Sequence, residues 1–170
     1  MAPLEIITVP DPRLKEVAAP IERFDDDLRR FVDDLEQTMR AGPGAVGIAA
    51  PQVARLLRVA IVDVSGKKKV ESHGRLVLIN PEITEWDGMA IGREGCMSVP
   101  DYTGNVIRAE RVSITAYDER GEQHTYEMKG YEARATQHEI DHLDGILFLD
   151  RLVSRRSDLF RRKVYAKPGA

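Results

Sequence analysis

"QHEIDHLDG", residues 137–145, is the stretch on which the fold and the chemistry of this chain depend. In a helix, His138 and His142 lie one turn apart on the same face, where both imidazoles can reach one metal ion. Glu139 then projects beside that ion, within reach of a proton from an activated water. The periodicity of residues 131–143 agrees with a helix, so we predict one that carries two metal ligands and a base. The alternative is a helix with two histidines of no special role.

A metal bound by two histidines requires a third protein ligand, and no His, Glu or Cys follows His142. The two remaining histidines stand in a polar loop and after a turn, where we expect them at the surface: His73 and His124. Cys96, in "REGCMSVP", is the only cysteine of the chain, and a thiolate suits a transition metal. We therefore predict Cys96, His138 and His142 as the ligands; the alternative is that the cysteine is an inert, buried thiol.

The composition indicates one globular domain. The chain has 170 residues, of which 42% are hydrophobic and 31% charged. We predict a catalytic domain over residues 1–150, with residues 151–170 as a basic helix or tail of the same domain. No apolar run reaches the length of a membrane span, and the N-terminus lacks the apolar stretch of a signal peptide. We therefore expect a cytoplasmic protein with no membrane partner.

The pattern of apolar residues predicts an α+β fold with mostly antiparallel sheet, because most strands follow one another without an intervening helix. Helices are expected at residues 25–40, 131–143 and 155–164. Strands are expected at residues 57–64, 75–83 (ended by Asn80-Pro81), 105–118, 123–129 and 146–149.

One glycine motif has to be set aside. "GPGAVG", residues 42–47, matches the dinucleotide-binding pattern G-x-G-x-x-G. That pattern must follow a strand and open a helix, whereas here it follows the predicted helix at 25–40 and contains a proline. We therefore expect no dinucleotide site.

Three segments in order resemble the peptide deformylase family: "GAVGIAAPQ" (44–52), "EGCMS" (94–98) and "QHEIDHLDG" (137–145). The resemblance covers residues 4–165. It implies antiparallel sheets packed around a central helix that bears the H-E-x-x-H motif, with N-terminal and C-terminal helices. It also implies a hydrolase that removes the formyl group from the N-terminal formylmethionine of nascent proteins.

The resemblance implies a role for individual residues. Cys96, His138 and His142 would bind one divalent metal, commonly Fe²⁺ in the family, with Zn²⁺, Ni²⁺ or Co²⁺ as alternatives. Glu139 would be the general acid and base. The formyl oxygen would be held by a side-chain amide and by a backbone N–H, those of Gln52 and Met97. A groove for the substrate backbone would be lined by Val46, Gly47 and Gly95.

Helical phasing also turns two residues of the motif helix toward the metal, Tyr131 and Ala135, and the small side chain of the second leaves room for a methionine. Asp141 is adjacent to His142 and is a candidate to orient that ligand, or else an exposed carboxylate. Arg108 matches a family arginine that is expected to pair with Glu94.

The first segment departs from the family pattern G-x-G-L-A-A-x-Q. Ala45 stands at its first glycine and Ile48 at its leucine, so the loop before Val46 is expected to differ in shape unless Gly44 takes over the glycine's role. Met97 replaces a leucine, a swap that conserves volume.

Two other functions share parts of this pattern. One is a metallopeptidase that cuts internal peptide bonds, and the other is a non-catalytic, metal-binding module associated with ribosomes. A basic C-terminal tail would serve both the ribosome-associated module and a deformylase. Residues 151–170 hold seven Lys or Arg and one Asp, which suggests docking on ribosomal RNA rather than DNA, or simply a solvated helix. The six basic residues considered for docking are Arg151, Arg155, Arg156, Arg161, Arg162 and Lys163.

Overall fold

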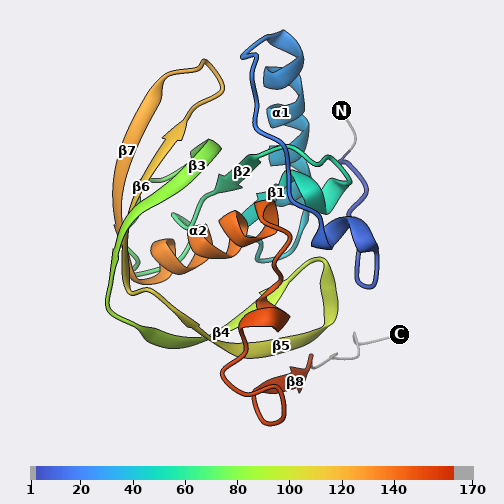
Figure 1. Cartoon of the computed structure of the whole chain (residues 1–170), viewed down its shortest axis with the longest axis vertical. Coiled ribbons are helices and arrows are strands. Elements are labelled where there is room, and N and C mark those ends of the chain that lie inside the picture. Colours follow the sequence, from blue (N-terminus) through green and yellow to red (C-terminus); the bar gives the residue numbers. More distant parts are fainter. Residues whose placement is uncertain (1–2, 163–170) are drawn as a thin grey trace.

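Helix α2 (Gly130–Leu143) lies between two antiparallel sheets in the computed structural model, which describes residues 3–162 (Figure 1). Most of its residues are buried, because strands cover more than one of its faces. The helix predicted at residues 131–143 is therefore confirmed. No helix among the described residues is both long enough and apolar enough to cross a membrane.

The larger sheet has five strands in the order β1-β2-β3-β6-β7. Their bounds are Gly47–Ala49 for β1, Val59–Val62 for β2, Leu76–Asp87 for β3, Arg111–Tyr117 for β6 and Gln123–Lys129 for β7. Buried aliphatic side chains of β2, β3 and β6 pack against α2 or α1, so the two helices cover this sheet. Strand β1 lies at its edge and has only three residues.

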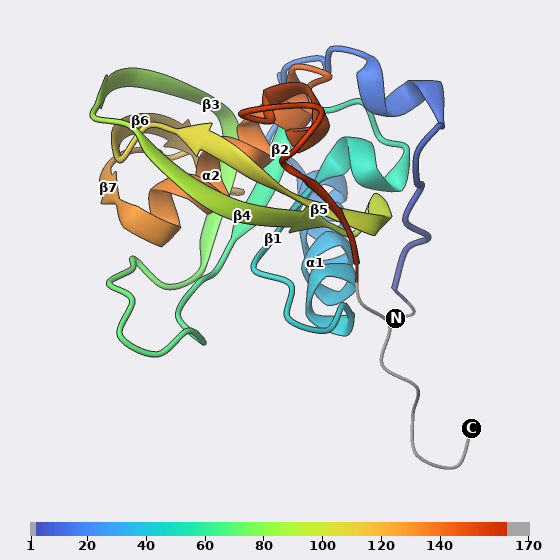
Figure 2. The same ribbon diagram turned by 90° about the horizontal axis from the view of Figure 1, so that it is seen from below.

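The smaller sheet has three strands in the order β4-β5-β8: Ala90–Cys96, Val99–Arg108 and Leu159–Arg161. It crosses α2 on the side away from α1 (Figure 2). Within residues 3–162, strand β4 pairs only with β5, so its second edge is open there. The metal-site cysteine is the last residue of that open-edged strand.

Helix α1 (Asp26–Ala41) confirms the helix predicted at residues 25–40. The Asp25 side chain accepts a hydrogen bond from the Leu28 N–H at 2.9 Å and thereby caps the first turn. Phe31, Val32 and Leu35 form its buried stripe against β1 and β2. The cap supplied by the Asp25 carboxylate and the helical spacing of the apolar residues are both local features, which is why the sequence predicts this element well.

The strand predicted to end at Asn80-Pro81 continues to Asp87, so that boundary was wrong. Asn80 has a φ of +52°, and the register against β6 shifts between Ile79 and Glu82, which makes the dipeptide a bulge inside the strand. The Asn80 side chain bonds both backbone groups of Ile21, at 2.8 Å to N and 2.9 Å to O. This tertiary contact stabilises the unusual backbone.

The single strand predicted at residues 105–118 is two strands that belong to different sheets, β5 and β6. The break falls at Ala109, whose N–H and C=O bond the side-chain amide of Gln137 at 3.0 and 2.9 Å. A helix side chain thus replaces the strand partner of this residue. The alternation of apolar and polar residues continues through this break, so the sequence pattern gives no sign of it.

Two C-terminal predictions were also wrong. Residues 146–149, expected as a strand, lead into a 3-10 helix at Phe148–Arg151, because Asp150 accepts a hydrogen bond from the Leu147 N–H and closes a turn. The C-terminal helix expected at 155–164 is absent from its described part, which forms turns and the strand β8. Residues 163 and 164 lie outside the described range.

The predicted fold class, α+β with antiparallel sheets, is confirmed. The strands at 57–64 and 123–129 are found as β2 and β7. Three strands were missed, β1, β4 and β8, and the first two carry or adjoin the residues of the site.

Candidate active site

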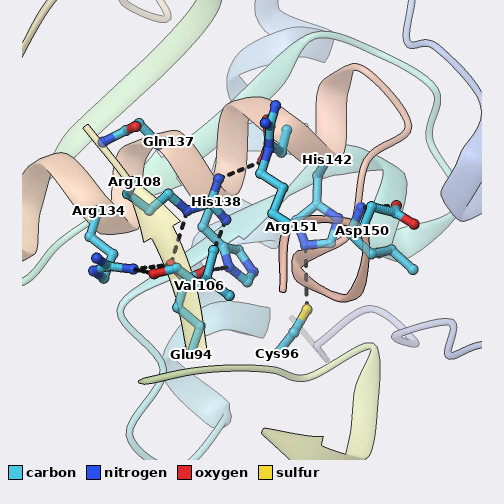
Figure 3. Close-up of polar contacts among 12 residues, drawn as sticks. Glu94, Cys96, Val106, Arg108, Arg134, Gln137, His138, His142, Asp150 and Arg151 are labelled. Atoms are coloured by element: carbon cyan, nitrogen blue, oxygen red, sulfur yellow. Dashed lines mark hydrogen bonds and ion pairs between the residues drawn. The ribbon is translucent and has the colours of Figure 1, made fainter. Parts of the chain in front are cut away.

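Three side chains, one from strand β4 and two from helix α2, converge in the interior of the molecule. The sulfur of Cys96 and one nitrogen from each of His138 and His142 all lie within 4.8 Å of one another. The Cys96 Sγ is 3.3 Å from the His142 Nε2. The histidines come from adjacent turns of α2 and the cysteine from the end of β4, as Figure 3 shows for the cysteine below the helix. The structure thus brings together the three residues that the sequence singled out.

Glu94 orients the first histidine. Its Oε1 lies 2.8 Å from the His138 Nδ1, which turns the other ring nitrogen toward Cys96. Both Glu94 oxygens also accept hydrogen bonds from Arg108 at 2.9 Å, and Arg134 donates a further bond at 2.7 Å (Figure 3). Burial alone would raise the pKa of Glu94, but the hydrogen bonds from Arg108 and His138 outweigh it and hold that pKa well below its usual value. The carboxylate is therefore ionised.

The donor set fits a divalent transition metal. One thiolate and two imidazoles leave a fourth position free, as in catalytic rather than structural sites. Burial and the charges of His138 and Arg108 lower the pKa of His142, which keeps this ring in its neutral, metal-binding form. Burial would also lower the pKa of His138, but its contacts with Cys96 and Glu94 outweigh burial and raise it. Negative groups that favour a proton at this position also favour a metal cation.

Glu139 is the third residue of the helix that was predicted to be functional. Its side chain is buried, and its Oε1 has no hydrogen-bond partner among the described residues. Burial, reinforced by the negative charge of Glu94, raises the pKa of Glu139 to about 7. A carboxyl group with such a pKa can both accept and return a proton near neutral pH.

Gly47 makes the position of Glu139 possible. A Cβ on this residue of β1 would lie 2.5 Å from the Glu139 Oε2 and 2.9 Å from its Cγ. Only glycine therefore lets the strand pass so close to the carboxylate of Glu139. The same loop contains Gly44 at a φ of +70°, so this glycine supplies a conformation that Ala45 resists.

Gln52 is held with its amide nitrogen toward the site. Its Oε1 accepts a hydrogen bond from the Ala49 N–H at 2.9 Å, which leaves Nε2 to face the Cys96 Sγ at 3.4 Å and the Ser98 Oγ at 3.2 Å. The residue is fully buried in a 3-10 turn, Ala50–Val53, that directly follows β1. A fixed amide donor beside a metal site is suited to binding a carbonyl oxygen.

A cavity of about 570 Å³ opens onto these residues. Its wall includes ten of the eleven residues that the sequence nominated: Val46, Gly47, Gln52, Gly95, Cys96, Met97, Tyr131, Ala135, His138 and Glu139. His142 is the exception: it is almost fully buried, with its Nε2 3.3 Å from the Cys96 Sγ. The cavity also has three arginines that the sequence reasoning missed, Arg93, Arg134 and Arg162.

Asp141 does not orient His142. It is buried and pairs with Arg108 at 2.5 Å and with Arg151 at 2.5 Å. The predicted pairing of Arg108 with Glu94 is confirmed. Arg134 was missed, although it stands one helical turn before His138, and that spacing was a signal that could have found it.

Comparison with known proteins adds an independent result. The polypeptide deformylase family model matches residues 3–158. The curated peptide deformylase of Alkalilimnicola ehrlichii is 46% identical over 96% of this chain and 90% of its own length. That of Heliobacterium modesticaldum is 49% identical over 89% and 95%.

Solved structures agree. A peptide deformylase from Legionella pneumophila superposes with a TM-score of 0.83 at 39% identity, covering 91% of this chain and 89% of that one. A peptide deformylase from Ehrlichia chaffeensis in complex with actinonin superposes with a TM-score of 0.84 at 35% identity, covering 92% of each chain.

Replacing Arg108 by methionine tests the buried network. We expect Arg108→Met to lower the free energy of unfolding by about 3 kcal/mol, because two buried carboxylates lose their shared partner. Metal affinity should fall about 10-fold to 100-fold, since Glu94 no longer holds His138 firmly. Urea denaturation and metal competition measure the two effects.

Arg111→Met is the matched control, because Arg111 forms an exposed pair with Asp87 at 3.3 Å and its loss should change little. An Arg108→Met protein with the wild-type metal affinity would contradict the role given to the network.

Proposed function

The chain belongs to the polypeptide deformylase family, and we propose that Cys96, His138 and His142 hold its catalytic metal while Glu139 moves the proton of the reaction. The protein is a hydrolase that removes the N-formyl group from formylmethionyl nascent peptides. The observation that supports the proposed roles is the buried set of one sulfur and two ring nitrogens, with the carboxyl group of Glu139 beside it.

A divalent ion at this site, when bound, would supply Lewis acidity that polarises the formyl carbonyl and acidifies a water molecule. We propose Fe²⁺ as the native metal, with Zn²⁺, Ni²⁺ or Co²⁺ as replacements. The thiolate supports a transition metal over Mg²⁺ or Ca²⁺, which prefer oxygen ligands.

The chain's own residues divide the remaining work. Glu139 takes the proton from the attacking water and returns it to the departing amine, as its raised pKa permits. The Gln52 amide and the Met97 backbone N–H hold the formyl oxygen while negative charge develops on it. Because Gln52 is locked by Ala49, little reorganisation accompanies this step.

The open edge of β4 supports a substrate that binds as an added strand. Gly95 lies on this edge, and Val46 and Gly47 line the opposite wall of the cavity. An extended peptide between them can hydrogen-bond to backbone on both sides. Tyr131 and Ala135 on α2 line the same cavity, and we assign them to the methionine pocket.

The two other functions have less support. A metallopeptidase with the H-E-x-x-H motif takes its third ligand from downstream of the second histidine, whereas no His, Glu or Cys follows His142 in this chain. A non-catalytic module has no use for Glu139, whose burial without a partner costs stability.

We also propose that the protein is cytoplasmic, that residues 1–150 form its catalytic domain with 151–170 as a tail, and that the tail docks on the ribosome. Arg155, Arg156 and Arg161 are exposed, which supports such docking. Arg151 is less available for docking than the other three, because it already forms an ion pair with Asp141. Lys163 lies outside the described residues.

Formate release tests the proposed function. We expect the metal-loaded protein to release formate from formyl-Met-Ala-Ser and Glu139→Gln to lower kcat at least about 100-fold while it retains the metal. Cys96→Ser should lose metal as well as activity. Glu85→Gln, at an exposed strand position, is the matched control. Metal content is measured beside kcat, and a loaded protein that cuts internal peptide bonds but releases no formate would disprove the proposal.

Gly47→Ala probes the close approach of β1 to Glu139. The added methyl group must push the carboxyl group aside, because Cγ as well as Oε2 lies within 3.0 Å of it. We expect kcat to fall about 10-fold to 100-fold with full metal content. Gly66→Ala is the control, since nothing lies within 4 Å of its Cβ position. An unchanged kcat would show that the position of Glu139 does not depend on Gly47.

Ribosome docking should depend on salt. We expect binding of the purified protein to ribosomes to weaken steeply between 50 and 200 mM salt, and reversal of charge at Arg155, Arg156 and Arg161 to abolish it. Sedimentation with ribosomes measures the bound fraction. Binding that is independent of both salt and these charges would remove the tail from the interaction.

A further inference from the structure

The arginines at the mouth of the cavity lie on a defined face of strand β4. Its side chains alternate, so Gly92, Glu94 and Cys96 face α2 and the metal ligands, whereas Arg93 and Gly95 face outward. Both Arg93 and Gly95 are exposed to solvent. Arg93 is therefore directed away from the network around Glu94, although it directly precedes Glu94 in the sequence.

Two guanidinium groups gather on the outward face. Arg93 lies over the Phe160 ring at 3.9 Å and donates hydrogen bonds to Asn105 at 3.1 Å and Thr103 at 3.3 Å, which fix its position. Arg162, just beyond β8, has its Nη2 only 2.8 Å from the place where a Gly95 Cβ would be. A side chain at Gly95 would displace Arg162.

These charges are not neutralised within residues 3–162. Neither Arg93 nor Arg162 forms an ion pair there, whereas Arg134, the third arginine of the cavity, pairs with Glu94 at 2.7 Å. The only carboxylates in the cavity wall are those of Glu94 and Glu139, both buried on the other face. Two acids lie near this side: Asp158, which accepts a hydrogen bond from Asn105, and Asp101, whose backbone carbonyl accepts one from the Arg162 N–H. Neither carboxylate forms an ion pair with Arg93 or Arg162 within the described residues.

A peptide added to the open edge of β4 must also alternate. With its methionine side chain in the cavity toward α2, the side chain of the next residue points to the outward face. Directly opposed strand residues have Cβ positions about 5 Å apart, so a carboxylate on that next residue reaches the Arg162 guanidinium beside Gly95. The bound peptide thus places its methionine side chain on the face toward α2 and its next side chain on the face that carries the two arginines.

We propose that Arg93 and Arg162 make this enzyme prefer formylmethionyl peptides with an acidic residue directly after the methionine. This inference rests on the proposed function and on the binding of substrate along β4. The arginines act on specificity and lie away from the reacting atoms. Their contribution is that of exposed ion pairs, which is modest for each pair and sensitive to salt.

The test compares peptides that differ in one side chain. Formyl-Met-Glu-Ser, formyl-Met-Gln-Ser and formyl-Met-Lys-Ser, all with amidated C-termini, remove any contribution from a terminal carboxylate. At low salt we expect kcat/KM for the Glu peptide to exceed that for the Gln peptide about threefold to tenfold, with the Lys peptide lowest. The ratio should shrink toward one in 0.5 M NaCl.

Variants locate the effect. In R93Q/R162Q the ratio of Glu to Gln should fall to about one, and in R162E the Lys peptide should overtake the Glu peptide. R161Q is the matched control, because Arg161 is an exposed arginine that does not line the cavity and should leave the ratio intact. Each ratio is measured within one preparation, so partial misfolding cancels.

Equal kcat/KM for the three peptides, or a Glu preference that survives in R93Q/R162Q, would overturn the inference while leaving the deformylase activity in place. Absence of formate from all three peptides would instead overturn the proposed function.

Discussion

The carboxylate of Glu94 is the group on which the site depends. It joins β4 to α2 through His138, to β5 through Arg108, and to the first half of α2 through Arg134. Both of its oxygens are buried and fully bonded, so its position follows from elements far apart in the sequence. Because Cys96 is two residues along the same strand, fixing Glu94 also fixes the thiolate against the histidines. One interaction thus places the ligands contributed by two different elements.

This arrangement is costly. Burying an ion pair requires desolvation that its attraction barely repays, and a well-packed apolar cluster would give equal or greater stability. Here the network extends outward from Glu94 through Arg108 and Asp141 to Arg151, whose side chain is partly exposed. The charges are alternately negative and positive along this path, so each buried group has an opposite neighbour. What the network supplies is the orientation of His138, which an apolar core cannot provide.

The difference between local features and contacts between residues far apart in the chain explains which elements could be predicted from the sequence. Helix α1 and the motif helix follow from local periodicity and capping, and the ligand set followed from the lack of a suitable residue after His142. The breaks in the strands did not, because Asn80 and Gln137 act on the backbone through partners remote in sequence, Ile21 and Ala109. Alternation of side chains continues through both breaks. Strands β1 and β4 were not predicted because β1 has only three residues and because glycines and charged residues interrupt the apolar pattern of β4.

Those glycines are where the fold serves the reaction rather than the core. Gly47 and Gly95 stand on edge strands, which proteins usually shorten or cover because an open edge attracts other chains. Here β1 is cut to three residues, and the open edge of β4 carries Gly95 at the cavity wall. Removing the side chains lets one strand approach Glu139 and lets Arg162 lie against the other. An edge that would otherwise promote aggregation is thereby restricted to a peptide that can place its first side chain in the cavity. The proposed choice among nascent chains therefore rests on the residues that flank these glycines rather than on those of the candidate metal site.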